Sequence, residues 1–148
     1  GVYGASKLKG ERNIQEFMEA YFILRTSWLY SEYGNNFMKT MLKLSKTRDE
    51  INVVADQIGT PTYAGDLAEA ILKIIADKII HYGIYHYSNE GVVSWYDFAV
   101  EIANRLNSSC IVHPVPTSEY PLPAQRPPYS VLSKEKIKKL NQKSISPR

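Results

Sequence analysis

A tyrosine and a lysine stand four residues apart near the start of the sequence, as Tyr3 and Lys7. On a helix this spacing places both side chains on one face, one turn apart. A nearby ammonium favours the phenolate and lowers the pKa of a tyrosine from about 10 toward neutrality. Such a tyrosine can protonate a carbonyl oxygen while hydride reaches the carbon. With 11 tyrosines in the chain, chance alone supplies about one such pair, so the spacing needs support from its surroundings.

Alternating helix and strand patterns surround and follow this pair, which favours an α/β fold. Apolar stripes or caps predict one helix over 5–20 and three more that begin near residues 37, 66 and 95. Runs of apolar and β-branched residues predict strands at 21–30, 51–55, 84–88 and 110–115. The first helix carries a one-sided apolar stripe of Ile14, Phe17, Met18 and Tyr21, and the third carries one of Leu67, Ile71, Ile74 and Ile75.

Three helix starts carry candidate caps. An asparagine at 35–36, Asp66, and Ser94 followed by Asp97 each precede an apolar stripe, and the last pair resembles a capping box. The eight glycines form no G-x-G-x-x-G, so the sequence contains no phosphate-cradling turn of the dinucleotide-binding type.

The composition limits the function classes. With 148 residues and 44% hydrophobic content, one globular domain is expected, and no apolar run is long enough to span a bilayer. The single cysteine, Cys110, fits a reducing compartment such as the cytoplasm. The lysines near the C-terminus lack interleaved aromatics, so we predict no nucleic-acid partner. The three histidines and Cys110 show no metal-ligand spacing, so no metal site is predicted.

The segment Tyr3-Gly4-Ala5-Ser6-Lys7-Leu8-Lys9-Gly10-Glu11 resembles the active-site helix of extended short-chain dehydrogenases/reductases. Further blocks, in the same order, resemble the dTDP-4-dehydrorhamnose reductase family within that superfamily: Arg25-Thr26-Ser27-Trp28-Leu29-Tyr30, Gly34-Asn35-Asn36-Phe37, Asp56-Gln57-Ile58-Gly59-Thr60-Pro61-Thr62, Asp66-Leu67-Ala68, Ser94-Trp95-Tyr96 and Arg126-Pro127-Pro128-Tyr129-Ser130. These blocks span residues 3 to about 132.

The resemblance implies a role for each matching residue. Tyr3 would be the proton donor, and Lys7 would hold the ribose of NADPH or NADH and tune that tyrosine. Arg25, Thr26 and Ser27 would lie beside the cofactor, at the end of a strand.

The resemblance also implies a pocket for a dTDP-linked deoxyhexose. The implied substrate-binding residues are Trp28, Asn35, Asn36, Gln57, Thr60 and Arg126. A guanidinium binds phosphate bidentately, and a helix start suits a pyrophosphate, so Arg126 and the two asparagines carry physical arguments of their own. The resemblance also implies a possible homodimer and, as in some members of the family, a divalent cation such as Mg²⁺ at the dimer interface.

The fold implied is the C-terminal part of an extended short-chain dehydrogenase Rossmann-type fold, with its small α/β substrate-binding domain. Because no Gly-rich turn precedes Tyr3, we expect the N-terminal nucleotide-binding half to be absent and the chain alone to be inactive. Without that half, the apolar faces of the first helix and of the strand at 21–30 should be exposed or find a substitute partner. Residues 1–148 would form a single unit, in which 1–50 end the Rossmann-type domain and 51–148 mainly bind substrate.

The implied activity is NAD(P)H-dependent reduction of the C4 keto group of dTDP-4-dehydro-L-rhamnose, for polysaccharide biosynthesis. Two alternatives stay open. One is an epimerase or dehydratase of the same superfamily that acts on another nucleotide sugar, against which the Arg-Thr-Ser-Trp block argues. The other is a non-catalytic regulatory or binding subunit of the same fold.

Overall fold

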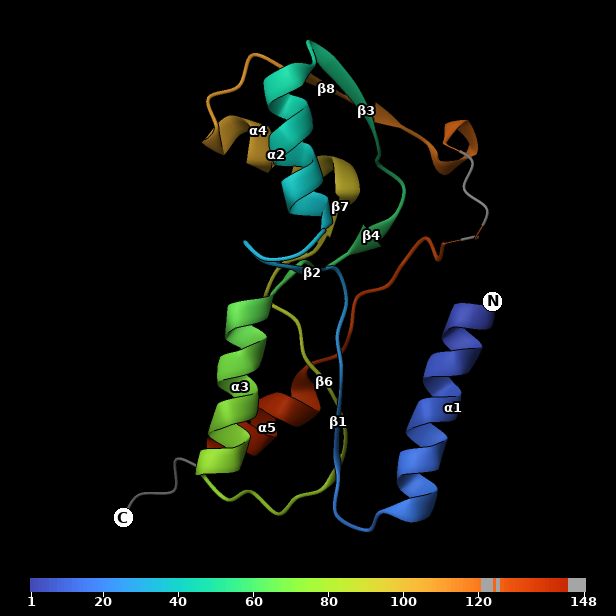
Figure 1. Ribbon diagram of the computed structural model, residues 1–148, viewed down its shortest axis with the longest axis vertical. Coiled ribbons are helices and arrows are strands. Elements are labelled where there is room, and N and C mark those ends of the chain that lie inside the picture. Colours follow the sequence, from blue (N-terminus) through green and yellow to red (C-terminus); the bar gives the residue numbers. More distant parts are fainter. Residues whose placement is uncertain (121–123, 125, 144–148) are drawn as a thin grey trace.

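The computed structural model describes residues 1–120, 124 and 126–143 (Figure 1). The helices are α1 (Val2–Phe17), α2 (Phe37–Thr47), α3 (Ala64–Ala76), α4 (Trp95–Arg105) and α5 (Glu135–Lys143), with a short 3₁₀ helix η1 (Thr117–Glu119). The strands are β1 (Phe22–Arg25), β2 (Leu29–Tyr30), β3 (Glu50–Val54), β4 (Ile58–Gly59), β5 (Thr62–Tyr63), β6 (Gly83–His86), β7 (Val93–Ser94) and β8 (Ile111–Val115).

The strands pair in twos. β1 pairs with β6, β2 with β5 and β3 with β8, all in parallel, while β4 and β7 are antiparallel. Parallel neighbours require crossover connections, and here α2, α3 and α4 lie within those connections. The predicted α/β class is therefore confirmed.

Two hydrophobic cores stabilise the two ends of the molecule. The first lies between α2, α4 and β3 and is built on Met41, Val53, Ala99 and Ile102. The second lies between α3, α5 and β6 and is built on Ile74, Tyr85, Ile137 and Leu140. In Figure 1 the elements around the first core (α2, α4 and β3) lie in the upper part of the view and those around the second (α3, α5 and β6) in the lower part.

The pairing of β6 with β1 bears on the division at residue 50. Ile23 lies opposite Ile84, so a strand from the second predicted segment completes the sheet begun by the first. Helices α3 and α5 cover that same pair of strands through the second core. The division into 1–50 and 51–148 stays a prediction. Strands of the two segments pair with each other, β1 with β6 and β2 with β5.

Helix α1 stands apart beside β1 (Figure 1). None of its residues is buried, and Phe17 and Met18 are exposed. The helix itself was predicted correctly, and its exposed stripe agrees with the expectation that this face is uncovered without a nucleotide-binding half. Of the apolar stripe predicted for α3, only Ile74 is buried, while Ile71 and Ile75 are exposed.

The predicted continuous strand at 21–30 is also wrong. It divides into β1 and β2 because the backbone of Trp28 adopts a φ of 48°, which no strand contains. Asp66 does not cap α3 but lies in its first turn, where its carboxylate accepts a hydrogen bond from the side chain of Asn89. The predicted capping box of Ser94 and Asp97 is confirmed.

Candidate functional site

One pocket of about 410 Å³ opens between α2, the end of β3, the start of α4 and the chain after η1. Its walls are largely apolar, with Phe37, Met41 and Val53 drawn from the first hydrophobic core and its margin. Polar groups enter at a few points only, from Thr40, Asn52, Gln57 and Arg126. An apolar cavity with few convergent polar groups is the usual form of a small-molecule site.

Two sequence-predicted substrate residues, Gln57 and Arg126, line this pocket together. Gln57 is only 6% exposed, and its side-chain amide donates a hydrogen bond of 3.0 Å to the hydroxyl of Thr117. Arg126 is exposed at the rim. The arrangement gives the pocket a fixed amide inside and a cation at its mouth.

The hydroxyl of Thr117 also donates to Asp56, at 2.5 Å, and the backbone N–H of Thr117 donates to the same carboxylate at 2.9 and 3.0 Å. These hydrogen bonds favour the ionised form and hold the pKa of the Asp56 carboxyl below its ordinary value. Asp56 and Gln57 thus contact one threonine from adjacent positions.

Trp28 reaches the pocket through a second tryptophan. Its ring stacks on that of Trp95, with centroids 3.6 Å apart and planes 13° apart, and it is Trp95 that lines the cavity. Trp95 also contacts the ring of Phe37, at 4.6 Å between centroids. Gly59 permits this stack, because a Cβ there would lie 2.5 Å from the indole of Trp28. The backbone at Trp28 is left-handed, which turns the side chain out of the strand direction.

Thr26, Ser27 and Thr60 form a separate polar network. The hydroxyl of Ser27 donates to the carbonyl of Thr60 at 3.1 Å, and that of Thr26 donates to Thr62 at 3.2 Å. Thr60 is completely buried, and its own hydroxyl donates to the carbonyl of Gly91 at 2.8 Å. These side chains join the end of β1 to the β4–β5 connection.

Asn36 caps α2, as its position predicted. Its side-chain oxygen accepts a hydrogen bond from the backbone of Lys39, and its amide donates to the carbonyl of Ser31 at 2.7 Å. Asn35 precedes it on the exposed surface. Neither asparagine is among the residues that line the pocket.

Arg25 pairs with Glu11 of α1. Two parallel contacts of 2.5 and 2.8 Å join the guanidinium to the carboxylate, and His86 lies 3.5 Å from the same guanidinium. The hydrogen bonds from Arg25 lower the pKa of the Glu11 carboxyl and raise that of the guanidinium. This ion pair fixes the side of α1 against the end of β1.

Tyr3 and Lys7 lie on one face of α1, as their spacing predicted. The ammonium of Lys7 is 5.5 Å from the centre of the Tyr3 ring, within the range of a cation–π contact. Tyr3 is 77% exposed and does not line the pocket. Their catalytic role stays a prediction.

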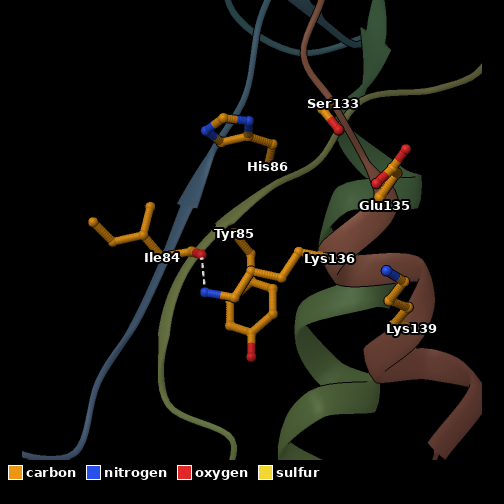
Figure 2. A pocket seen from close by; sticks show the side chains of 7 residues that line it. All are labelled: Ile84, Tyr85, His86, Ser133, Glu135, Lys136 and Lys139. Atoms are coloured by element: carbon orange, nitrogen blue, oxygen red, sulfur yellow. Dashed lines mark hydrogen bonds between the residues drawn. The ribbon is translucent and has the colours of Figure 1, made fainter.

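A second hollow, of about 350 Å³, lies between β6 and α5 (Figure 2). Lys136 crosses it, donating to the carbonyl of Ile84 at 2.7 Å with its ammonium 4.3 Å from the centre of the Tyr85 ring. None of the sequence-predicted site residues lines this hollow. The pocket that holds Gln57 is therefore the candidate site.

Sequence reasoning missed several residues of that pocket. Trp95 and Phe37 were assigned to helix starts rather than to a cavity, and Asn52 and Tyr120 were not singled out. The available signal was that both aromatics begin capped helices, whose first turns face the same opening. Tyr120 follows η1, which no local pattern predicted.

Similarity to known proteins supports an assignment of the chain to a family. The family model described as the RmlD substrate binding domain matches residues 1–147. This chain belongs to that family.

Individual relatives of this RmlD-family chain support the assignment. It is 48% identical over 146 residues to a dTDP-4-dehydrorhamnose reductase of Aggregatibacter actinomycetemcomitans, covering 92% of this chain and 50% of the relative. It is 46% identical to the spore coat polysaccharide biosynthesis protein SpsK of Bacillus subtilis, covering 92% and 47%. The chain therefore spans about half the length of the curated relatives it matches.

A solved dTDP-4-dehydrorhamnose reductase of Bacillus anthracis, in complex with NADP, superposes with a TM-score of 0.88 at 50% identity. The match covers 95% of this chain and 49% of that structure. The predicted resemblance is thus confirmed, and so is the fold class as part of a Rossmann-type oxidoreductase fold.

Two further observations concern the described residues only. No helix among them is long and apolar enough to cross a membrane. Within the same part of the chain, no three histidine, cysteine or acidic side chains cluster as metal ligands would.

Proposed function

We propose that this chain supplies the substrate pocket and the tyrosine–lysine pair of an NAD(P)H-dependent reductase. The reaction converts dTDP-4-dehydro-L-rhamnose to dTDP-L-rhamnose for polysaccharide biosynthesis in the cytoplasm. A homodimer, and a divalent cation at its interface, remain predictions from the family resemblance.

The chemistry assigned to the chain is proton transfer. The reduced nicotinamide, when bound, supplies a hydride to C4 of the keto-sugar. Tyr3 gives its phenolic proton to the C4 oxygen, so the carbonyl becomes a hydroxyl. Lys7 stabilises the resulting phenolate from one helical turn away and contacts the ribose of the cofactor. Thr26 and Ser27 shape the strand end beside that cofactor.

The observation that carries this proposal is the meeting of Gln57 and Arg126 in one largely apolar pocket. The Arg126 guanidinium suits a diphosphate, with which it forms paired charge-assisted hydrogen bonds. The Trp95 ring, supported from behind by Trp28, offers a flat apolar wall to a base or a sugar. Thr60 is buried and bonded to Ser27 and Gly91, and Asn35 and Asn36 lie at the start of α2, whose N–H groups favour a phosphate.

A calorimetric titration of the chain with dTDP tests the pocket without the rest of the reaction. We expect saturable 1:1 binding, and Arg126→Ala should weaken it about tenfold or more because charge-assisted hydrogen bonds are worth about 1.5–3 kcal/mol. Arg12→Ala is the matched control, since Arg12 is exposed on α1.

The same titration separates the alternatives. Absence of dTDP binding would contradict the proposal and favour a non-catalytic binding subunit. Equal binding of UDP and dTDP would favour an epimerase or dehydratase that acts on another nucleotide sugar.

A further inference from the structure

Helix α1 contacts the end of β1 through Glu11, which lies on the same face of the helix as Tyr3 and Lys7 (Figure 1). The three residues follow one another at four-residue intervals, so neighbouring members lie about 40° apart around the helix axis. Glu11 is the least exposed residue of α1, and its side chain is 15% exposed. The face that carries the proposed catalytic pair is therefore also the face that meets β1.

Arg25, the last residue of β1, holds the Glu11 carboxylate with two parallel contacts. Its Nε donates to one carboxylate oxygen at 2.8 Å, and its Nη2 donates to the other at 2.5 Å. The remaining nitrogen, Nη1, lies 3.5 Å from Nε2 of His86, the residue opposite Arg25 in β6. Paired contacts of this kind fix the orientation of the two groups as well as their distance.

This ion pair is the polar anchor of α1 among the described residues. None of the 16 residues of the helix is buried. Within the described part of the chain, every side-chain hydrogen bond or ion pair from α1 to another element belongs to Glu11 and Arg25. The rotation of α1 about its own axis is consequently limited chiefly by this pair.

We propose that Glu11 and Arg25 are positioning residues, which turn the Tyr3–Lys7 face of α1 toward the end of β1. The inference rests on the proposed function, in which Tyr3 and Lys7 act on the keto-sugar and the cofactor. Because the ion pair acts through the orientation of two other side chains, its loss should lower kcat and leave the KM values for cofactor and sugar unchanged.

Two other roles for the ion pair predict different results. If Arg25 contacted the cofactor directly, its loss would raise the KM for NADPH and the loss of Glu11 would not. If the charge of Glu11 tuned the proposed catalytic pair, its removal would shift the pH dependence of kcat, because a carboxylate stabilises the Lys7 ammonium. A positioning role leaves that pH dependence in place, because Tyr3 and Lys7 stay one turn apart on the same helix.

The orientation of α1 is measurable in the chain by itself. Spin labels at Ser6→Cys on α1 and Glu69→Cys on α3, both at exposed positions, report the distance between the two helices by pulsed electron paramagnetic resonance. We expect one narrow distance distribution in the original chain and a broader one after Glu11→Gln or Arg25→Gln. Glu16→Gln is the matched control, because Glu16 is exposed on the same helix. Distributions of unchanged width would overturn the inference.

The consequence for chemistry is measured in a protein that joins this segment to a nucleotide-binding half, by NADPH oxidation with dTDP-4-dehydro-L-rhamnose. Because Arg25 is 42% exposed, the ion pair can favour one orientation by no more than about fivefold. Glu11→Gln and Arg25→Gln should therefore each lower kcat about three- to fivefold. The double variant should lower kcat no further, because both substitutions remove the same pair. Arg25→Lys keeps the charge without the paired contacts and should lower kcat as well.

Several results would contradict the positioning role. They are unchanged kcat in both single variants, multiplied losses in the double variant, full activity of Arg25→Lys, a shifted pH dependence in Glu11→Gln, and a raised KM for NADPH in Arg25→Gln alone. If Arg25→Gln does not fold, Glu11→Gln decides through kcat and its pH dependence.

Failure of this inference is distinguishable from failure of the proposed function. If Tyr3→Phe loses activity while Glu11→Gln and Arg25→Gln keep full kcat, only the positioning role is lost. If Tyr3→Phe keeps full activity, the proposed function is wrong and the inference is wrong with it.

Discussion

The two regions that carry the predicted site residues differ in how they are held. The pocket around Gln57 and Trp95 is enclosed by a hydrophobic core and by hydrogen bonds between distant segments. Tyr3 and Lys7 lie on a helix with no buried residue, joined to the rest chiefly by one ion pair through Glu11. The chain therefore contains a pocket supported by its own core and a proposed catalytic pair on an exposed helix.

The difference separates binding from chemistry. Proton transfer is efficient where the reacting groups are held in place and water is excluded, and the exposed face of α1 provides neither among the described residues. The ligand binding proposed for the pocket would use side chains that this chain itself places there. Substitutions in the two regions should consequently change different measured quantities.

The largest expected effect is that of Tyr3→Phe on reduction. Loss of the phenolic proton should lower kcat about 10²- to 10⁴-fold in a protein that joins this segment to a nucleotide-binding half. The rate is followed by NADPH oxidation with dTDP-4-dehydro-L-rhamnose. Neither the affinity of the pocket for dTDP nor the thermal stability should change, because Tyr3 is largely exposed.

Tyr33→Phe serves as the control for that substitution, since Tyr33 is also highly exposed. Full reductase activity in Tyr3→Phe would remove the tyrosine from the mechanism. Loss of dTDP binding in the same variant would contradict the separation of the two regions.

Next in size is the contrast between two glycines. Gly59→Ala would place a Cβ against the Trp28 ring and 2.8 Å from the Ser130 hydroxyl, so the free energy of unfolding should fall by about 1–3 kcal/mol. Gly10→Ala on α1 meets nothing within 4 Å and should raise it by about 0.5–1 kcal/mol. Denaturant unfolding measures both, and tryptophan fluorescence reports on the Trp28–Trp95 stack.

Opposite signs for the two glycines are required if the regions differ as described. A destabilising Gly10→Ala would show that α1 is packed more closely than its exposure indicates. An unchanged Gly59→Ala would show that the tryptophan stack shifts at little cost.

Substitution of Ser94 and of Ser6 should show the same difference between the two regions, with smaller effects on stability. Ser94 accepts the Asp97 N–H at 3.0 Å in the capping box of α4, and Ser94→Ala should cost about 1 kcal/mol of stability. Because α4 begins with Trp95, dTDP binding should weaken as well. Ser6→Ala on α1 removes only a bond to the carbonyl of Tyr3 and should be neutral or slightly stabilising. Equal effects of the two substitutions on thermal unfolding would contradict the contrast.

Local features of this fold could be predicted from the sequence. The starts of α2 and α4 follow from Asn36 and from the Ser94 capping box, because a cap and an apolar stripe act within a few residues. Periodicity marks the apolar face of α1 without showing what covers it, and only the family resemblance predicted that this face is exposed without a nucleotide-binding half.

The site was partly predictable for the same reason. Gln57 and Arg126 were identified through the family resemblance, and the structure brings them into one pocket. The bond between Asp56 and Thr117 joins residues 61 positions apart, and no local pattern contains it. The left-handed backbone of Trp28 could not be predicted from the local sequence either. Non-glycine residues adopt this conformation only where tertiary contacts offset its cost in free energy.

The smallest expected effect concerns the ion pair that holds α1. The hydrogen bonds from Arg25 hold the pKa of the Glu11 carboxyl below its ordinary value of 4.5, so the folded state favours the carboxylate. This stabilisation is fully present above pH 4.5 and is lost as the pH falls through the lowered pKa of the folded state. Because Arg25 is 42% exposed, the pair is worth less than about 1 kcal/mol.

Glu11→Gln should therefore lower the free energy of unfolding by about 0.5 kcal/mol at pH 7, and this difference should shrink as the pH falls below 4.5. Denaturant unfolding at several pH values measures it, with Glu16→Gln on the same helix as the control. Added salt should reduce the difference at pH 7, because exposed charges are screened. A difference that stays constant with pH would mean that Glu11 supports α1 through packing rather than through its charge. The proposed catalytic pair would then be held by contacts of the same kind as the pocket.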